Sequence, residues 1–242
     1  MTLPPPGSLH SWKPIRTPRP VDTHVSLARK NQLPARVTFA LGSTGAASDE
    51  EFSRLKDLRK LAESQPQLRA DVIKLFEDGV MEFPSQTAAM LEPYLEANGK
   101  PGKNLGRLYR ETGPLVDFVR RADAEGFGIH ITRLATVRRA CRIDAFAAAR
   151  AQGSKRSYSF AHLELVDPAD IPRFRDLDVT ASLQLQWHDQ TTYSVDAVLP
   201  YIGPERQARL YPERSLWAAG ARVAGGSDWA CLDLQSLRGH RR

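Results

Sequence analysis

Residues 158–171 read Tyr-Ser-Phe-Ala-His-Leu-Glu-Leu-Val-Asp-Pro-Ala-Asp-Ile, and this stretch decides the fold. Its first part, Tyr158–Leu163, is apolar and β-prone, which predicts a buried strand. Asp167 followed by Pro168 predicts a helix start, because proline fits the first helical position after a capping residue. The predicted helix runs over Asp167–Leu177. A strand followed closely by a helix is the repeating unit of a parallel α/β sheet.

The same unit recurs along the chain from residue 33 onward. The predicted strands are Arg36–Leu41, Val72–Phe76, Gly128–Thr132, Tyr158–Leu163, Thr180–Leu185 and Ala221–Gly225. The predicted helices are Ser48–Ser64, with Ser48 as cap, Thr87–Asn98, Pro114–Glu125, Val137–Gln152, Asp167–Leu177 and Leu210–Ala219. Six such units suit a doubly wound sheet or most of a (β/α)8 barrel. No Gly-x-Gly-x-x-Gly follows the first strand, which argues against a dinucleotide-binding fold.

The N-terminal residues 1–30 are rich in proline, serine and arginine and show no helical or strand period. We therefore expect this segment to be irregular or disordered. A complete barrel typically needs about 250 residues. With 242 residues in total and thirty of them outside the pattern, two strands are expected to be absent. The fold predicted is an α/β fold, an incomplete (β/α)8 TIM barrel.

Composition excludes several classes of protein. The apolar runs are too short to span a bilayer, and the first residues show no basic segment followed by an apolar one, so we expect neither a membrane span nor a secretory leader. Cys141 and Cys231 lie far apart and form no Cys-x-x-Cys, which favours a reducing, cytoplasmic location. The net charge is +6, but much of the arginine sits in 133–142 and 238–242, and no nucleic-acid partner is expected.

Four polar residues stand at the ends of successive predicted strands: Lys74, His130, His162 and Asp228. Taken singly, each histidine has an ordinary alternative as a core or loop residue, and Lys74 could reach solvent along its alkyl stem. Taken as a set at strand ends, where barrels carry their chemistry, they predict a metal site. One or two zinc-like ions would activate water, with Asp228 moving the proton.

Three further residues are candidates for contact with a substrate. Trp187 and His188 follow one predicted strand, and Trp229 follows Asp228 at the end of another. The alternatives are a loop position for His188 and a core position for either tryptophan. These alternatives stay open at the level of the sequence.

Several stretches together resemble amidohydrolase family 3, which includes the N-substituted formamide deformylases. The matching stretches are residues 33–37, 73–80, 87–94, 161–174, 201–206 and 225–229. The resemblance implies a distorted (β/α)8 barrel with a small β-sandwich built from both chain ends, and hydrolysis of carbon–nitrogen bonds other than peptide bonds. It numbers the strands of this chain as the third to the eighth of the metal-dependent hydrolase barrel, with the β-sandwich domain missing.

The resemblance also implies roles for single residues. Lys74 matches the fourth-strand lysine, whose carbamylated form bridges two metal ions. His162 matches the sixth-strand ligand, and Asp228 matches the eighth-strand aspartate that acts as ligand and proton shuttle. The departures are equally specific: no His-x-His, the first-strand ligand pair, occurs anywhere in the chain, and Thr132 stands where the fifth strand should carry a second histidine.

Two segments are compatible with a shifted reading frame. Dropping one base from a codon string for the family's fifth-strand sequence gives residues 132–138, and the family pattern resumes at Asp144. Residues 230–242 can be coded so that reading one base later restores the family's continuation. We therefore divide the chain into an irregular segment 1–30, a partial barrel 31–229 and an aberrant tail 230–242. An intact frame through both segments of the gene would contradict this hypothesis.

The expected function combines the set of polar residues at the strand ends with the resemblance to amidohydrolase family 3. The intact form is expected to be a metal-dependent amidohydrolase acting on a small amide, with zinc as cofactor, and this chain is expected to be inactive alone. The alternative is a non-catalytic remnant or binding module with an incomplete metal site. Unpaired strand edges of an open barrel would favour association into a homo-oligomer.

Overall fold

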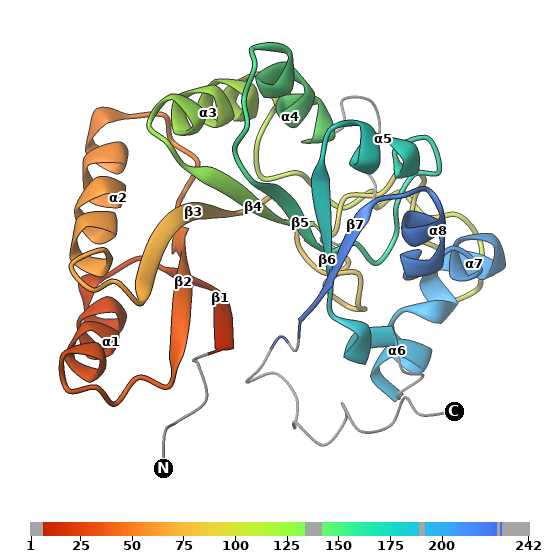
Figure 1. Cartoon of the computed structure of the whole chain (residues 1–242). Coiled ribbons are helices and arrows are strands. Elements are labelled where there is room, and N and C mark those ends of the chain that lie inside the picture. Colours follow the sequence, from red (N-terminus) through yellow and green to blue (C-terminus); the bar gives the residue numbers. More distant parts are fainter. Residues whose placement is uncertain (1–6, 134–141, 189–191, 227, 229–242) are drawn as a thin grey trace. The chain divides into compact units, whose positions relative to one another are not determined.

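The computed structural model describes residues 7–133, 142–188, 192–226 and 228, in which strands and helices alternate along the chain (Figure 1). The elements are β1 Gly7–Ile15, α1 Pro18–Arg29, β2 Ala35–Gly42, α2 Asp49–Ala62, β3 Leu68–Phe76, α3 Thr112–Ala124, β4 Gly128–Arg133, α4 Arg142–Ala151, β5 Tyr158–His162, α5 Ile171–Asp176, β6 Val179–Leu183, the 3-10 helix η1 Leu185–His188, α6 Thr192–Ala197, α7 Leu199–Gln207, α8 Glu213–Ala218 and β7 Arg222–Gly225. No helix in these ranges is long and apolar enough to cross a bilayer.

The strand order distinguishes between the two folds that the sequence allowed. The described strands follow one another in the sheet in the order of the sequence, from β1 to β7. β1 pairs with β2, β2 with β3, β5 with β6 and β6 with β7, and each of these pairs is parallel. A doubly wound sheet reverses its order at a switch point, whereas a barrel does not. The winding is therefore that of a (β/α) barrel, as predicted.

The expectation of an irregular N-terminal segment is wrong for most of residues 7–29. β1 pairs along β2, and α1 begins with Pro18 in the first turn, where proline costs no helical hydrogen bond. α1 buries Val21, Val25 and Ala28, a four- and three-residue spacing that makes one apolar helix face. The many prolines around this short apolar face make the helix hard to recognise in the sequence. A strand therefore precedes the first one that the sequence predicts.

The predicted helix over Thr87–Asn98 is also wrong. The segment 77–111 between β3 and α3 contains no helix, and its chain turns back so that the N–H groups of Thr87 and Ala88 both donate to the Val80 carbonyl at 2.8 Å. Its apolar residues pack into a separate small core instead of forming a helix stripe. The elements η1, α6 and α7 were not predicted. Residues 134–141 and 229–242, which include most of both frameshift-like segments, lie outside the described residues.

Contacts divide the chain into two compact units. The first comprises Met1–Leu75, Gly113–His130 and Ala148–Ser157, and the second comprises the remaining segments. In the first unit Phe52 contacts Phe118 and Phe127, with ring centroids 5.4 and 6.5 Å apart. The second unit has an aromatic core of its own, in which the Phe146 ring contacts those of Tyr158 and Phe160.

The start of α2 shows how local residues define one helix. Ser48 caps it as predicted, because the Ser48 side chain accepts a hydrogen bond from the N–H of Glu51 at 3.2 Å. The Glu51 carboxylate in turn accepts hydrogen bonds from Ser43 at 2.5 Å and from Arg54 at 2.9 Å. Burial raises the pKa of Glu51, but the hydrogen bonds from Arg54 and Ser43 outweigh it and hold this pKa below its ordinary value.

We expect Glu51→Gln to remove part of the acid sensitivity of folding. Because the folded-state pKa of Glu51 lies below the unfolded value of about 4.3, its contribution is complete above that pH and is lost as pH falls through the folded-state pKa. Urea unfolding between pH 7 and pH 3 should therefore show a difference between wild type and Glu51→Gln that shrinks on acidification. The exposed neighbour Glu50 supplies the control, Glu50→Gln. An unchanged difference across that range would contradict the assignment.

Candidate metal and substrate site

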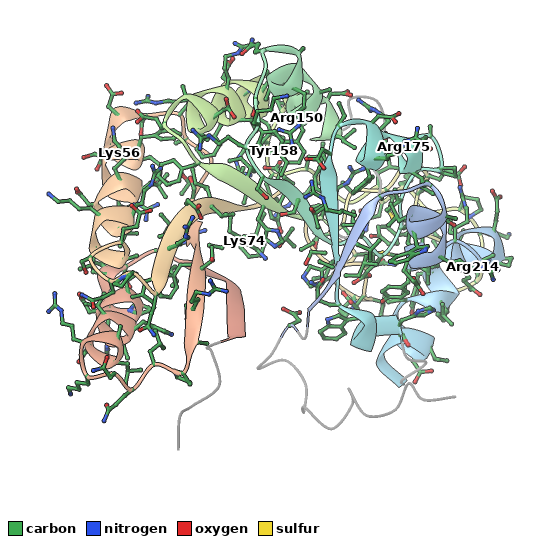
Figure 2. All side chains as sticks on the ribbon, viewed as in Figure 1. Lys56, Lys74, Arg150, Tyr158, Arg175 and Arg214 are labelled. Carbon is green, nitrogen blue, oxygen red and sulfur yellow. The ribbon has the colours of Figure 1, made fainter. Side chains whose placement is uncertain are left out.

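Two of the predicted site residues belong to the first unit, Lys74 on β3 and His130 on β4. Lys74 is only 6% exposed, so the alternative of a lysine that extends into solvent is wrong (Figure 2). His130 is completely buried. Burying an ammonium group costs free energy unless polar groups bind it. The buried Lys74 side chain therefore needs polar partners.

Thr132 tests whether the end of β4 suits a metal ion. Thr132 lies two residues after His130 in the same strand, so the two side chains point to the same face of the sheet. Thr132 is 4% exposed, and its hydroxyl oxygen has no hydrogen-bond partner among the described residues. Zinc in proteins is held by imidazole, thiolate or carboxylate groups. On this face β4 thus offers one imidazole and one hydroxyl, which do not by themselves complete a zinc site.

His162 ends β5 in a tight turn. Its φ of 70° and the φ of 55° at Leu163 both lie in the left-handed region, which is uncommon for residues other than glycine. Two hydrogen bonds hold the turn, from the His162 N–H to Gln184 Oε1 at 2.9 Å and from the Leu163 N–H to the Arg133 carbonyl at 2.9 Å. Backbone strain of this kind is often found at functional sites. His162 therefore has a fixed backbone position at the end of its strand.

The buried carboxylates of the second unit were not predicted as site residues from the sequence. Glu77 and Asp78, immediately after β3, are both buried, and Arg110 Nη1 pairs with Glu77 Oε1 at 2.5 Å. Glu164 is also buried, and burial followed by the charges of Glu82 and Asp78 raises its pKa well above the ordinary value. The adjacent acids after a predicted apolar strand were the signal that could have identified Glu77 and Asp78.

The ends of β6 and β7 bring Trp187 to Asp228. The Trp187 indole Nε1–H donates a hydrogen bond to Asp228 Oδ2 at 3.2 Å. The next residue, His188, places Nδ1 3.1 Å from Glu213 Oε1, and its ring stacks on Tyr211 with centroids 5.0 Å apart. Two candidates for substrate contact are therefore anchored by carboxylates. Trp229, the third, lies outside the described residues.

The four predicted metal ligands lie in two different units. Lys74 and His130 are placed within the first unit, and His162 and Asp228 within the second. Within residues 7–133, 142–188, 192–226 and 228, no group of three or more His, Cys, Asp or Glu side chains is arranged to hold a metal ion. What the structure does assemble is the hydrogen-bonded set around Trp187, His188 and Asp228.

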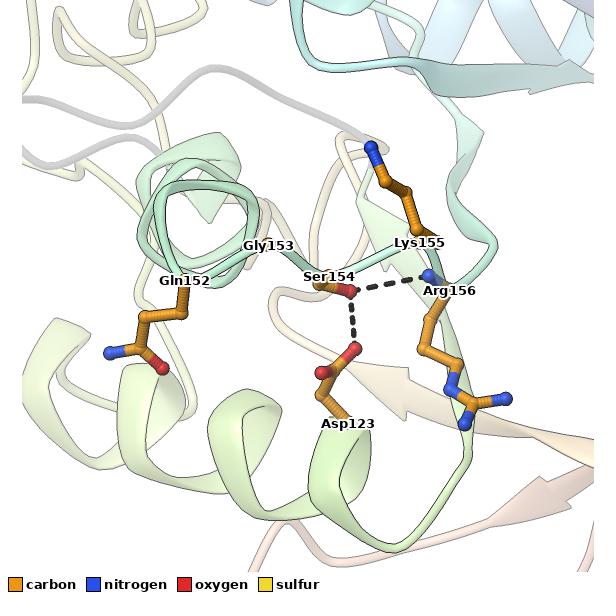
Figure 3. A pocket seen from close by; sticks show the side chains of 6 residues that line it. All are labelled: Asp123, Gln152, Gly153, Ser154, Lys155 and Arg156. Atoms are coloured by element: carbon orange, nitrogen blue, oxygen red, sulfur yellow. Dashed lines mark hydrogen bonds between the residues drawn. The ribbon is translucent and has the colours of Figure 1, made fainter.

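A separate pocket lies in the first unit, and no predicted site residue is among the residues that line it. Its lining residues are Asp123, Gln152, Gly153, Ser154, Lys155 and Arg156 (Figure 3). Ser154 donates a hydrogen bond to Asp123 and accepts one from the Arg156 N–H at 3.2 Å. Figure 3 shows the Lys155 and Arg156 side chains pointing away from each other. The residues that line it precede β4 and β5, at the strand ends opposite to those where barrels carry their chemistry.

Comparison with known proteins gives the family context. The model of the amidohydrolase family matches residues 12–239. A curated relative, the exoenzymes regulatory protein AepA of Pectobacterium carotovorum subsp. carotovorum, is 25% identical over 159 residues, which cover 66% of this chain and 32% of that protein. Uncharacterized metal-dependent hydrolases from Pyrococcus furiosus (19% identity, TM-score 0.65) and Pyrococcus horikoshii OT3 (18%, 0.66) share the fold over 94% of this chain. The chain spans 42% and 41% of those structures.

Proposed function

Because this chain belongs to the amidohydrolase family, we propose that its intact form hydrolyses an amide-like, non-peptide carbon–nitrogen bond of a small molecule. The family implies a divalent metal, and we propose zinc, with Lys74, His130, His162 and Asp228 as the ligands that this chain would contribute and Lys74 in carbamylated form. A cytoplasmic location and association through the sheet edges are parts of the same proposal. We further propose that the chain by itself does not turn over substrate.

The buried Thr132 hydroxyl carries the proposal of an inactive chain. A threonine oxygen is a weak ligand compared with an imidazole nitrogen, and this one lies on the same strand face as His130. The sequence also contains no His-x-His. The buried Thr132 hydroxyl favours the second candidate function for the chain as it stands, which is a non-catalytic binding module on a hydrolase fold.

The contacts of Asp228, His188 and Trp187 support the roles that we propose for them. Asp228 Oδ2 accepts the Trp187 indole N–H, so we assign proton transfer in the intact form to Asp228 Oδ1. His188 is held by Glu213 and Tyr211 and is proposed to contact the substrate beside Asp228. Trp187 acts on the reaction through Asp228, and Trp229 remains a proposed substrate contact.

Zinc binding and turnover test the proposal on the purified 242-residue chain. We expect less than one zinc per chain by elemental analysis and no hydrolysis of a panel of formamides and acyl amines. Thr132→His should tighten zinc binding by about tenfold or more, since a nitrogen ligand replaces a hydroxyl. Thr180→His, on β6, is the control and should leave zinc affinity unchanged. Stoichiometric zinc together with turnover by the unmodified chain would contradict the proposal.

A further inference from the structure

The segment 77–111 between β3 and α3 folds over a small core of its own. The residues of this core are Met81, Ala88, Met90, Tyr94, Leu165, Val198 and Ile202. The segment contains no helix or strand element. Connections longer than roughly 12–15 residues without such elements are uncommon and are usually functional. In a barrel, the loops that follow the strands carry the substrate contacts.

Hydrogen bonds hold this segment against α7 and against the last residue of α6. The Phe83 N–H donates to the Ala197 carbonyl at 2.8 Å, and the Leu95 N–H donates to the Tyr201 carbonyl at 2.7 Å. The buried Arg206 side chain donates a further hydrogen bond to a carbonyl of the segment at 3.0 Å. Side chains on a surface fixed in this way lose little freedom when a ligand binds.

Phe83 and Tyr201 form a stacked pair on this surface. Their ring centroids lie 4.6 Å apart and their planes differ by 6°. Tyr201 covers one side of Phe83, yet the Phe83 side chain is still 50% exposed. The large hydrophobic residues of this segment that are more than a third exposed are Val80, Phe83, Leu105 and Tyr109. Phe83 is the most exposed of these and the one that is part of a ring stack.

We propose that the Phe83–Tyr201 pair is a binding site for a planar ring of the substrate, so that the substrates are aryl amides. The inference rests on the proposed function, because that function makes the ligand an amide. A ligand ring would lie against the exposed part of Phe83, in the offset-stacked or edge-to-face geometry that aromatic rings favour. The Tyr201 hydroxyl is a donor and acceptor at the edge of this stack.

The size of the surface favours a small ligand over a protein partner. A specific protein interface buries about 800 Å² on each side. A single aromatic side chain buries about 150–250 Å². The exposed part of the Phe83–Tyr201 stack is on the scale of one ring, and the other exposed apolar residues of the segment, Val80, Leu105 and Tyr109, are each less than half exposed.

Ligand-detected NMR titrations on the 242-residue chain test the inference without requiring turnover. Acetanilide, with a planar ring, is compared with N-cyclohexylacetamide, which has the same amide and a puckered ring. We expect acetanilide to bind about tenfold more tightly, as stacking contributions of this kind imply. Phe83→Ala should abolish this preference. Trp217→Ala, which removes a 73% exposed ring on α8, is the control and should retain it.

Equal binding of the two amides, or a preference that survives Phe83→Ala, would overturn the inference. Benzyl alcohol separates the ring site from the proposed function. If benzyl alcohol binds as tightly as acetanilide and with the same dependence on Phe83, the amide group adds nothing to binding, so the ring site stands and only the assignment of an amide ligand is refuted. Thermal unfolding of Phe83→Ala, monitored by circular dichroism, confirms that the comparison is made between folded chains.

Discussion

Phe146→Ala is expected to lower the free energy of unfolding by about 3–5 kcal/mol, the range for removing a large buried aromatic side chain. Phe146 is completely buried on α4. Its ring stacks on Tyr158 with centroids 4.4 Å apart and planes 2° apart, and it contacts Phe160 at 5.0 Å. The substitution removes both ring contacts and leaves a cavity between α4 and β5.

Urea unfolding followed by circular dichroism measures this loss. The control is Trp217→Ala, where a mostly exposed ring is removed and the change should stay within about 0.5 kcal/mol. A loss below about 1 kcal/mol for Phe146→Ala would mean that α4 does not pack on β5 through this ring.

Arg110→Leu should destabilise the second unit by about 3–5 kcal/mol, because it removes one partner of a buried ion pair. Glu77 is completely buried, and Arg110 Nη1 lies 2.5 Å from its Oε1. The same nitrogen donates to the Phe76 carbonyl at 2.8 Å, so the guanidinium also holds the end of β3. Without it, the buried Glu77 carboxylate would lose this ion pair.

A double-mutant cycle with Glu77→Gln separates the pair from its surroundings. If the pair carries the effect, the double variant should be more stable than the sum of the two single losses predicts. The exposed pair of Arg222 and Asp178 offers the control, since Arg222→Leu should change the stability by less than about 1 kcal/mol. Additive losses in the cycle would contradict the assignment.

The sequence was sufficient for features that depend on neighbouring residues. The cap of α2 follows from Ser48 and Glu51, three residues apart, and β2 to β7 were found because each is a short apolar run beside a turn or a cap. Sequential βα units allowed either a doubly wound sheet or a barrel, and the strand order of the structure agrees with the barrel that the family resemblance implied. The same local pattern placed Lys74 and His130 in strands and His162 at a strand end, and in the structure His162 ends β5 while Lys74 and His130 lie two and three residues before the ends of β3 and β4.

Tertiary structure decided what depends on distant partners. β1 is a strand because β2 lies beside it, and the apolar residues of segment 77–111 form no helix because Leu165, Val198 and Ile202 supply a core for them. Trp187 and Asp228 are 41 residues apart in the chain and meet only after β6 and β7 pair. The sequence by itself determined a (β/α) winding with polar residues at its strand ends. Which of these residues touch one another was decided by long-range packing, because side-chain contacts at strand ends depend on how loops from different units fold over them.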